Sequence, residues 1–143
     1  MIRGIVTGSI VLAIAFFFTH FQFAHIGLMI IFALLTSLLF SLIGLLNGLI
    51  ADSFDSTSII PNFILTPLTY LGGVFYSVTM LPSAWQLLSH LNPILYMVDG
   101  FRYAVHGKSD IAPWISFIVL IACCLISFLT IWYYFSKGKG VRT

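Results

Sequence analysis

The apolar run from Ile26 to Ile50 constrains this chain more than any other feature, because it contains no charged residue over 25 positions. An α-helix of that length reaches about 37 Å, which exceeds the roughly 30 Å hydrocarbon core of a bilayer. Small residues recur in the run at helical spacing: Ser37, Ser41, Gly44 and Gly48. The run therefore predicts a transmembrane helix that packs closely against another helix.

Composition extends this environment to the whole chain. Of the 143 residues, 60% are hydrophobic and 7% are charged, whereas an ordinary soluble domain has about 25% charged residues. Lipid accepts apolar helix faces directly. We therefore predict an all-α integral membrane protein in contact with the lipid bilayer, and we expect no nucleic-acid partner.

The first apolar run covers about residues 4–19 and is shorter than the roughly 20 residues that a straight spanning helix needs. It follows Arg3 and precedes His20, Gln22 and His25, so a signal peptide is an alternative. No small-x-small cleavage site follows it, and another long apolar run does. These two observations favour a first transmembrane helix.

Two further runs complete the set of predicted spans. The third holds Pro61 and Pro67, which predict a bent helix because a proline removes one backbone hydrogen bond. The fourth runs from Trp114 to Phe135. We predict four transmembrane helices, at about residues 4–19, 26–50, 59–78 and 112–135.

Four crossings put both termini on one side of the membrane, and short cytoplasmic segments collect Lys and Arg. Most of the basic residues fall on that side: Arg3, Lys137, Lys139 and Arg142. The opposite side has Arg102 and Lys108. The charge pattern therefore predicts cytoplasmic termini and a cytoplasmic loop at residues 51–58.

The segment between the third and fourth spans reads "LPSAWQLLSHLNPILYMVDGFRYAVHG". Pro82 suits the start of a helix, and Pro93 breaks any helix that reaches it. Helices over about residues 82–92 and 94–106 would reach about 15 to 20 Å, too little to cross the membrane. We predict an external re-entrant helical hairpin, and a hairpin lying flat on the membrane surface is the alternative.

The second helix of this hairpin is predicted to be amphipathic. Polar side chains recur on one side at positions i, i+3, i+7 and i+10: Tyr96, Asp99, Tyr103 and His106. Asp99 and Arg102 are spaced to form an ion pair, which would lower the cost of holding both charges near lipid. The polar side is therefore expected to face protein or water.

A proline-bearing span that ends in "PLTYLGGVFYSVTMLP", followed by "HLNPILYMVDGFRYAVHG" and a last span, resembles the membrane subunit of type-2 ABC exporters. In that family a Leu-Pro pair, an Asn-Pro pair and an Arg shortly before a Gly mark the external re-entrant helices. The corresponding residues here are Leu81, Pro82, Asn92, Pro93, Arg102 and Gly107. With Tyr96 and Asp99 they form the predicted exit-gate motif.

The resemblance implies a permease subunit of an ATP-driven exporter in the bacterial inner membrane, which forms part of the translocation pathway. It also implies ATP hydrolysis on a separate ATP-binding cassette ATPase chain, no cofactor on this chain, and a permease homodimer. A membrane anchor or assembly partner that does not transport is the first alternative, and a membrane-embedded enzyme is the second.

Permeases of this family usually have six spans, and this chain has room for the third to the sixth. The resemblance thus implies that residues 1–143 are the C-terminal part of a transmembrane domain, whose N-terminal portion and main ATPase-docking segment are missing. Asp52 and Asp55 in the remaining cytoplasmic loop are then the expected ATPase contact. Two Gly-x-x-x-Gly pairs, Gly4 with Gly8 and Gly44 with Gly48, are expected to pack helices within one subunit or between two.

Motifs for catalysis or metal binding are weak in this sequence. Gly107, Lys108 and Ser109 end like a phosphate-binding loop, but Arg102 occupies the position where that motif needs a glycine. The four histidines lack a ligand spacing typical of zinc sites. Ser89, His90 and Asp99 could be drawn as a hydrolase triad, yet helix capping accounts for such residues. Cys123 and Cys124 are adjacent and are expected to fill space. We predict no catalytic, cofactor or metal site.

Overall fold

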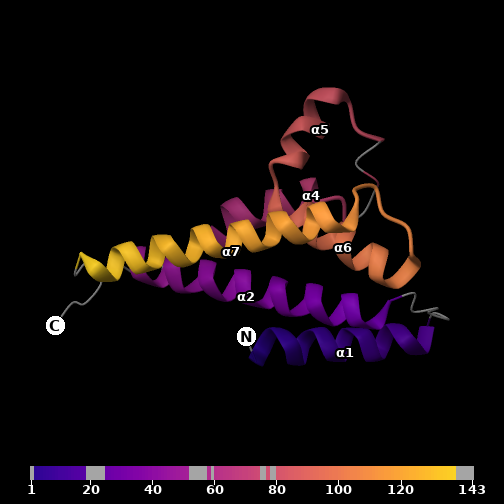
Figure 1. Cartoon of the computed structure of the whole chain (residues 1–143), viewed down its shortest axis with the longest axis horizontal. Helices are drawn as coiled ribbons and strands as arrows, with labels where there is room; N and C mark the ends of the chain where they lie inside the picture. Colours follow the sequence, from indigo (N-terminus) through magenta and orange to yellow (C-terminus); the bar gives the residue numbers. More distant parts are fainter. Residues whose placement is uncertain are drawn as a thin grey trace.

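The computed structural model describes residues 2–18, 25–51, 58, 60–74, 77 and 80–137, and in these ranges all regular structure is helical. Two long helices, α2 (Ile26–Ile50) and α7 (Pro113–Ser136), lie side by side, and α1 (Ile2–Phe18) covers part of α2 (Figure 1). The remaining helices lie on the other side of this pair or project from it.

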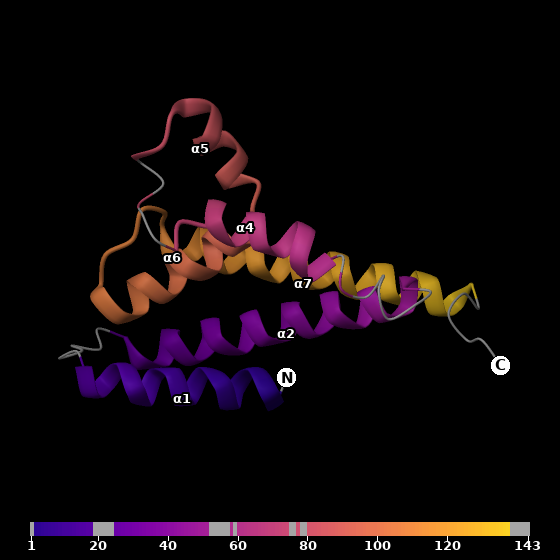
Figure 2. The same ribbon diagram turned by 180° about the vertical axis from the view of Figure 1, so that it is seen from behind.

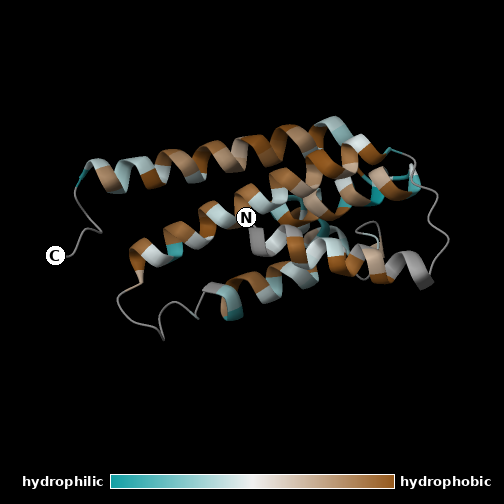
Figure 3. Cartoon of the chain, turned by 90° about the horizontal axis from the view of Figure 1, so that it is seen from below, coloured by the Kyte–Doolittle hydropathy of each residue, from teal (hydrophilic) through white to brown (hydrophobic). Residues whose placement is uncertain are grey.

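The helices α2 and α7 are long and apolar enough to cross a membrane. The bounds of α2 match the predicted second span, and α7 begins and ends within one residue of the predicted fourth. Pro113 stands at the first position of α7, where its missing N–H leaves no helical bond unmade. Hydrophobic residues follow α7 along most of its length, and hydrophilic ones gather toward its C-terminal end (Figure 3).

The directions of the long helices matter for the path of the chain. Both α2 and α7 begin at the same end of the molecule and run parallel, whereas α1 runs antiparallel to α2 (Figures 1 and 2). The sulfur of Cys124 lies 3.9 Å from the carbonyl oxygen of Leu35, near the middle of both helices. The two parallel helices therefore also meet near their middles.

The region of the predicted third span is helical from Ile60 to Leu71. It begins as a π-helix, η1 (Ile60–Leu65), and continues as α4 (Thr66–Leu71). Thr66 donates its hydroxyl to the carbonyl of Pro61 at 3.1 Å, and a turn begins at Gly72. A crossing over residues 59–78 stays a prediction.

The predicted hairpin corresponds to α5 (Ser83–His90) and α6 (Pro93–His106). Asn92 caps α6, because its Oδ1 accepts the N–H of Ile94 at 3.0 Å. Gly107 ends α6 in the left-handed conformation, with a φ of 68°, which a glycine adopts without strain. In both views α5 projects from the other helices, whereas α6 lies beside α7 (Figures 1 and 2).

The core lies where α6 meets the two long helices. Its buried members are Phe32, Leu39, Ile94, Met97, Leu120 and Cys124. Gly100 allows the closest approach, because a Cβ there would lie 2.6 Å from Cδ1 of Phe32 and closer still to Cε1. The helix α6 is thus held between α2 and α7 and brings its polar residues to their common end.

Candidate functional site

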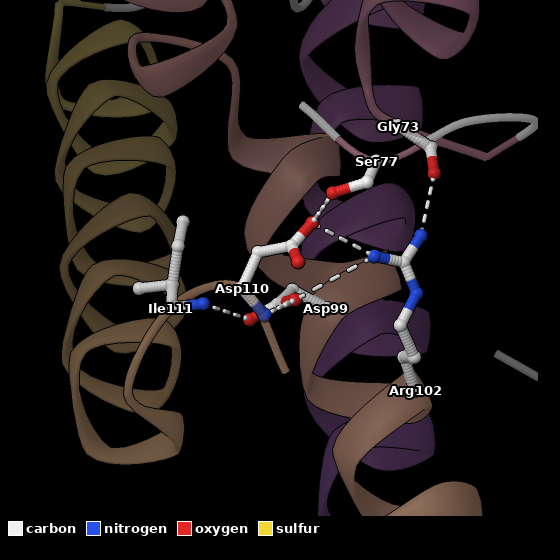
Figure 4. Close-up of polar contacts among 6 residues, drawn as sticks. All are labelled: Gly73, Ser77, Asp99, Arg102, Asp110 and Ile111. Atoms are coloured by element: carbon white, nitrogen blue, oxygen red, sulfur yellow. Dashed lines mark hydrogen bonds and ion pairs between the residues drawn. The ribbon is translucent and has the colours of Figure 1, made fainter. Parts of the chain in front are cut away.

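Asp99 is the most buried ionisable side chain in the described part of the hairpin, with 1% of its surface exposed. Its Oδ1 accepts the N–H of Asp110 at 2.8 Å, and its Oδ2 accepts the N–H of Ile111 at 3.0 Å (Figure 4). Burial raises the pKa of the Asp99 carboxyl above its ordinary value, and these two N–H bonds offset part of the rise. The Asp99 side chain therefore fixes the backbone of the link between α6 and α7.

Arg102 connects this link to a third segment. Its guanidinium donates to Oδ2 of Asp110 at 3.1 Å and to the carbonyl oxygen of Gly73 at 2.8 Å. The predicted pair with Asp99 is present at 3.9 Å, longer than the contact with Asp110. Asp110 is thus the nearer carboxylate to the arginine.

Ser77 completes the cluster by donating its hydroxyl to Oδ2 of Asp110 at 2.6 Å. We call the six residues drawn in Figure 4 the Asp110 network: Gly73, Ser77, Asp99, Arg102, Asp110 and Ile111. The network joins the chain after α4, the helix α6 and the chain before α7. It places two carboxylates around one guanidinium, so it can hold these three segments together at one end of the bundle.

A second group of contacts lies at the other end of α6. The side-chain amide of Asn92 donates to the carbonyl oxygen of Leu68 at 2.5 Å. The hydroxyl of Tyr96 donates to the carbonyl oxygen of His90 at 2.8 Å. The hairpin apex is therefore tied to α4 as well as capped. At the start of α5, Gln86 donates to the carbonyl of Leu81 at 2.8 Å, and Pro82 precedes the first helical residue.

Comparison with known families decides what kind of chain carries these contacts. The model of the ABC-2 type transporter matches residues 1–106. The chain belongs to the ABC-2 type transporter family.

Curated relatives agree with this ABC-2 membership. The chain is 48% identical over 141 residues to the inner membrane transport permease YadH of Escherichia coli K12, an alignment that covers 99% of this chain and 55% of that permease. It is 26% identical over 102 residues to nodulation protein J of Rhizobium leguminosarum bv. viciae, covering 71% of this chain and 39% of that protein. The chain thus spans about half the length of the YadH permease. No solved structure matches it.

The predicted exit-gate motif of this ABC-2 chain divides between the two groups of contacts. Asn92, Pro93 and Tyr96 lie at the apex, whereas Asp99 and Arg102 lie in the Asp110 network. Leu81 and Pro82 begin α5, and Gly107 ends α6. Their joint role as an exit gate stays a prediction.

The remaining predicted residues have different outcomes. Asp52 and Asp55 lie outside the described residues. A Cβ on Gly4 would lie 3.7 Å from Oγ of Ser37, so Gly4 faces α2, but a Cβ on Gly8, Gly44 or Gly48 would have nothing within 4 Å. The described part of the chain leaves those three glycine positions open.

Chemistry other than transport gains no support from the geometry. The described residues hold no group of three or more His, Cys, Asp or Glu that could bind a metal ion. Gly107, which begins the "GKS" sequence, ends a helix, whereas a phosphate-binding loop precedes one. Asp99 directs both carboxylate oxygens to backbone N–H groups, which suits holding a loop rather than orienting His90.

Sequence reasoning missed Asp110, although a signal for it was present. The chain has four acidic residues, and two of them, Asp52 and Asp55, lie in the predicted cytoplasmic loop. Asp110 is therefore the one other carboxylate that Arg102 could meet on its own predicted side. Counting charges on each side of the membrane would have identified it.

Proposed function

We propose that this chain is a transmembrane permease subunit of an ATP-driven ABC exporter and forms part of its substrate pathway. The observation that carries the proposal is the 48% identity to an inner membrane transport permease over 99% of the chain. The membership in the ABC-2 family and the two long apolar helices support it. The chain is not itself an enzyme in this proposal, and a separate ATP-binding cassette subunit hydrolyses ATP.

The proposed topology has four crossings in a bacterial inner membrane, with both termini in the cytoplasm. If α2 and α7 both cross, their parallel directions require the chain between them to cross an odd number of times. One crossing over about residues 59–78 meets this requirement. The hairpin α5 and α6 then adds none, because it enters and leaves on the outer side.

The length of α6 argues against a crossing, and its position supports a re-entrant hairpin over one lying flat on the membrane. Its 14 residues reach about 21 Å, less than a hydrocarbon core of about 30 Å. Its C-terminal end meets the start of α2, where the N–H of His25 donates to the carbonyl of Ala104 at 3.0 Å. Its N-terminal end packs Ile94 into the same core cluster as Leu39, the fourteenth residue of α2. These contacts support an apex at about the depth of the middle of α2, which a hairpin lying on the membrane surface would not reach.

The Asp110 network is the proposed closure of the pathway at the outer end. It ties the chain after α4 to α6 and to the start of α7, so separating these segments requires the guanidinium to leave both Asp110 and Gly73. A homodimer with the open glycine positions Gly44 and Gly48 at a helix contact completes the proposal.

A membrane anchor or assembly partner is the second candidate. Two helices long and apolar enough to cross a membrane are also what an anchor requires. Such helices could assemble with a partner without moving a substrate.

A chimera separates the two candidates. This chain would replace the matching 141 residues of the YadH permease, and the tagged chimera and the tagged chain alone would be purified from membranes. Because the YadH portion supplies the docking segment, both candidates allow the chimera to co-purify with an ATP-binding cassette subunit; under the permease proposal the ATPase activity of that complex also changes when Asp110→Asn is introduced. A chimera that recruits the ATPase but whose ATPase activity is the same with and without Asp110→Asn would contradict the permease proposal and favour the anchor.

A further inference from the structure

The C-terminal end of α7 carries aromatic and basic side chains that the proposed transport function does not use. Trp132 is 65% exposed, Tyr133 is 55% exposed and Phe135 is 51% exposed. Lys137 follows the helix, and its Nζ lies 4.4 Å from the centroid of the Tyr133 ring. The described part of the chain therefore leaves these rings largely uncovered and fixes an ammonium group over one of them.

The charged side chains at this end of the chain are all positive. The sequence has no acidic residue after Asp110, whereas Lys137, Lys139 and Arg142 fall in its last seven positions. A ring face attracts an ammonium group without using its N–H donors. Lys137 can therefore contact Tyr133 and donate hydrogen bonds to an anion at the same time.

Aromatic rings and basic groups together suit the headgroup region of a membrane. Tyr and Trp favour the level of the lipid headgroups, because they join an apolar ring to a polar atom. Basic residues next to a membrane helix attract anionic lipids, each by about fivefold. We propose that the end of α7 from Trp132 to Lys137 binds the headgroup of an anionic phospholipid, with Lys139 and Arg142 adding to the positive potential.

A simpler role for Lys137 is to oppose the negative end of the α7 dipole. Its backbone N–H already donates to the carbonyl oxygen of Tyr133 at 3.2 Å. The hydroxyl of Ser136 donates to the carbonyl oxygen of Trp132 at 2.9 Å. The dipole role does not depend on which lipid surrounds the helix. Lipid preference at this end therefore distinguishes the two roles.

Trp132 can report this preference directly. The chain has three tryptophans, so the double variant Trp85→Phe/Trp114→Phe leaves Trp132 as the single fluorophore. This variant would be reconstituted in phosphatidylcholine nanodiscs that contain either brominated phosphatidylglycerol or brominated phosphatidylcholine at equal mole fraction. We expect the anionic lipid to quench Trp132 with an apparent affinity at least about fivefold higher, the factor for one basic residue, and 0.5 M salt to reduce the difference.

Charge variants decide whether the basic residues cause the preference. Lys137→Gln is expected to lower the affinity ratio, and Lys137→Gln/Lys139→Gln/Arg142→Gln is expected to bring it close to one. The matched control Lys108→Gln removes an exposed lysine before the other end of α7 and leaves the ratio unchanged. Equal quenching by the two lipids at unchanged helix content would overturn the proposal, as would an equal loss in the Lys108→Gln control. Neither result depends on transport, so it tests the lipid site apart from the permease proposal.

Discussion

At the scale of single residues, Asp110 joins two residues of the sequence motif, Asp99 and Arg102, to the chain after α4. Its carboxylate accepts from Ser77 and Arg102, and its N–H donates to Asp99. Arg102 and Asp110 are 29% and 25% exposed, so water weakens their attraction without removing it. The Asp110 network therefore depends on hydrogen bonds with fixed directions as well as on charge.

Replacing Asp110 by Asn tests this residue. The change keeps the shape and one acceptor oxygen but removes the charge that Arg102 and Ser77 share, so we expect a loss of about 1 to 2 kcal/mol in unfolding free energy. Equilibrium unfolding of the detergent-solubilised chain would measure it. In a double-mutant cycle with Arg102→Gln the two losses should not add. Fully additive losses would show that the two side chains act independently.

At the scale of helices, most elements could be predicted from the sequence, but their contacts could not. Length and the absence of charge define α2, and Asn92 with Pro93 separates α5 from α6, because capping and proline geometry act locally. The approach of Gly100 to Phe32 joins residues 68 positions apart, and no local pattern encodes it. The same holds for Asp110 and Ser77, which are 33 positions apart.

The packing of α6 on α2 predicts the effect of a methyl group at Gly100. Gly100→Ala places a Cβ against the Phe32 ring, and overpacking of this kind costs about 1 to 3 kcal/mol. The higher helix propensity of alanine offsets at most about 1 kcal/mol of this cost. The matched control Gly27→Ala, also on α2, has nothing within 4 Å of its added Cβ and should not destabilise the chain. Thermal unfolding of both variants would measure the difference, and Phe32→Leu should partly rescue Gly100→Ala. Equal stability of the two variants would contradict this packing.

At the scale of the whole molecule, the parallel directions of α2 and α7 link the fold to the path of the chain through a membrane. Parallel spanning helices need a connection that returns to the starting side. Residues 51–112 contain a proline-bearing helical segment and a hairpin too short to cross, so this connection has one candidate crossing. The position of charges and the direction of helices therefore lead independently to the same proposed topology.

Labelling of single cysteines from one side of the membrane tests this topology. In a background with Cys123→Ala and Cys124→Ala, Lys108→Cys lies between α6 and α7 and should react with an impermeant maleimide on spheroplasts. Thr143→Cys and Ser58→Cys should react only after the membrane is permeabilised, because four crossings put both on the cytoplasmic side. Reaction of Thr143→Cys and Lys108→Cys from the same side would mean that α7 does not cross. Reaction of Ser58→Cys from outside, with Thr143→Cys protected, would instead remove the crossing between α2 and α7, and the proposed pathway with it.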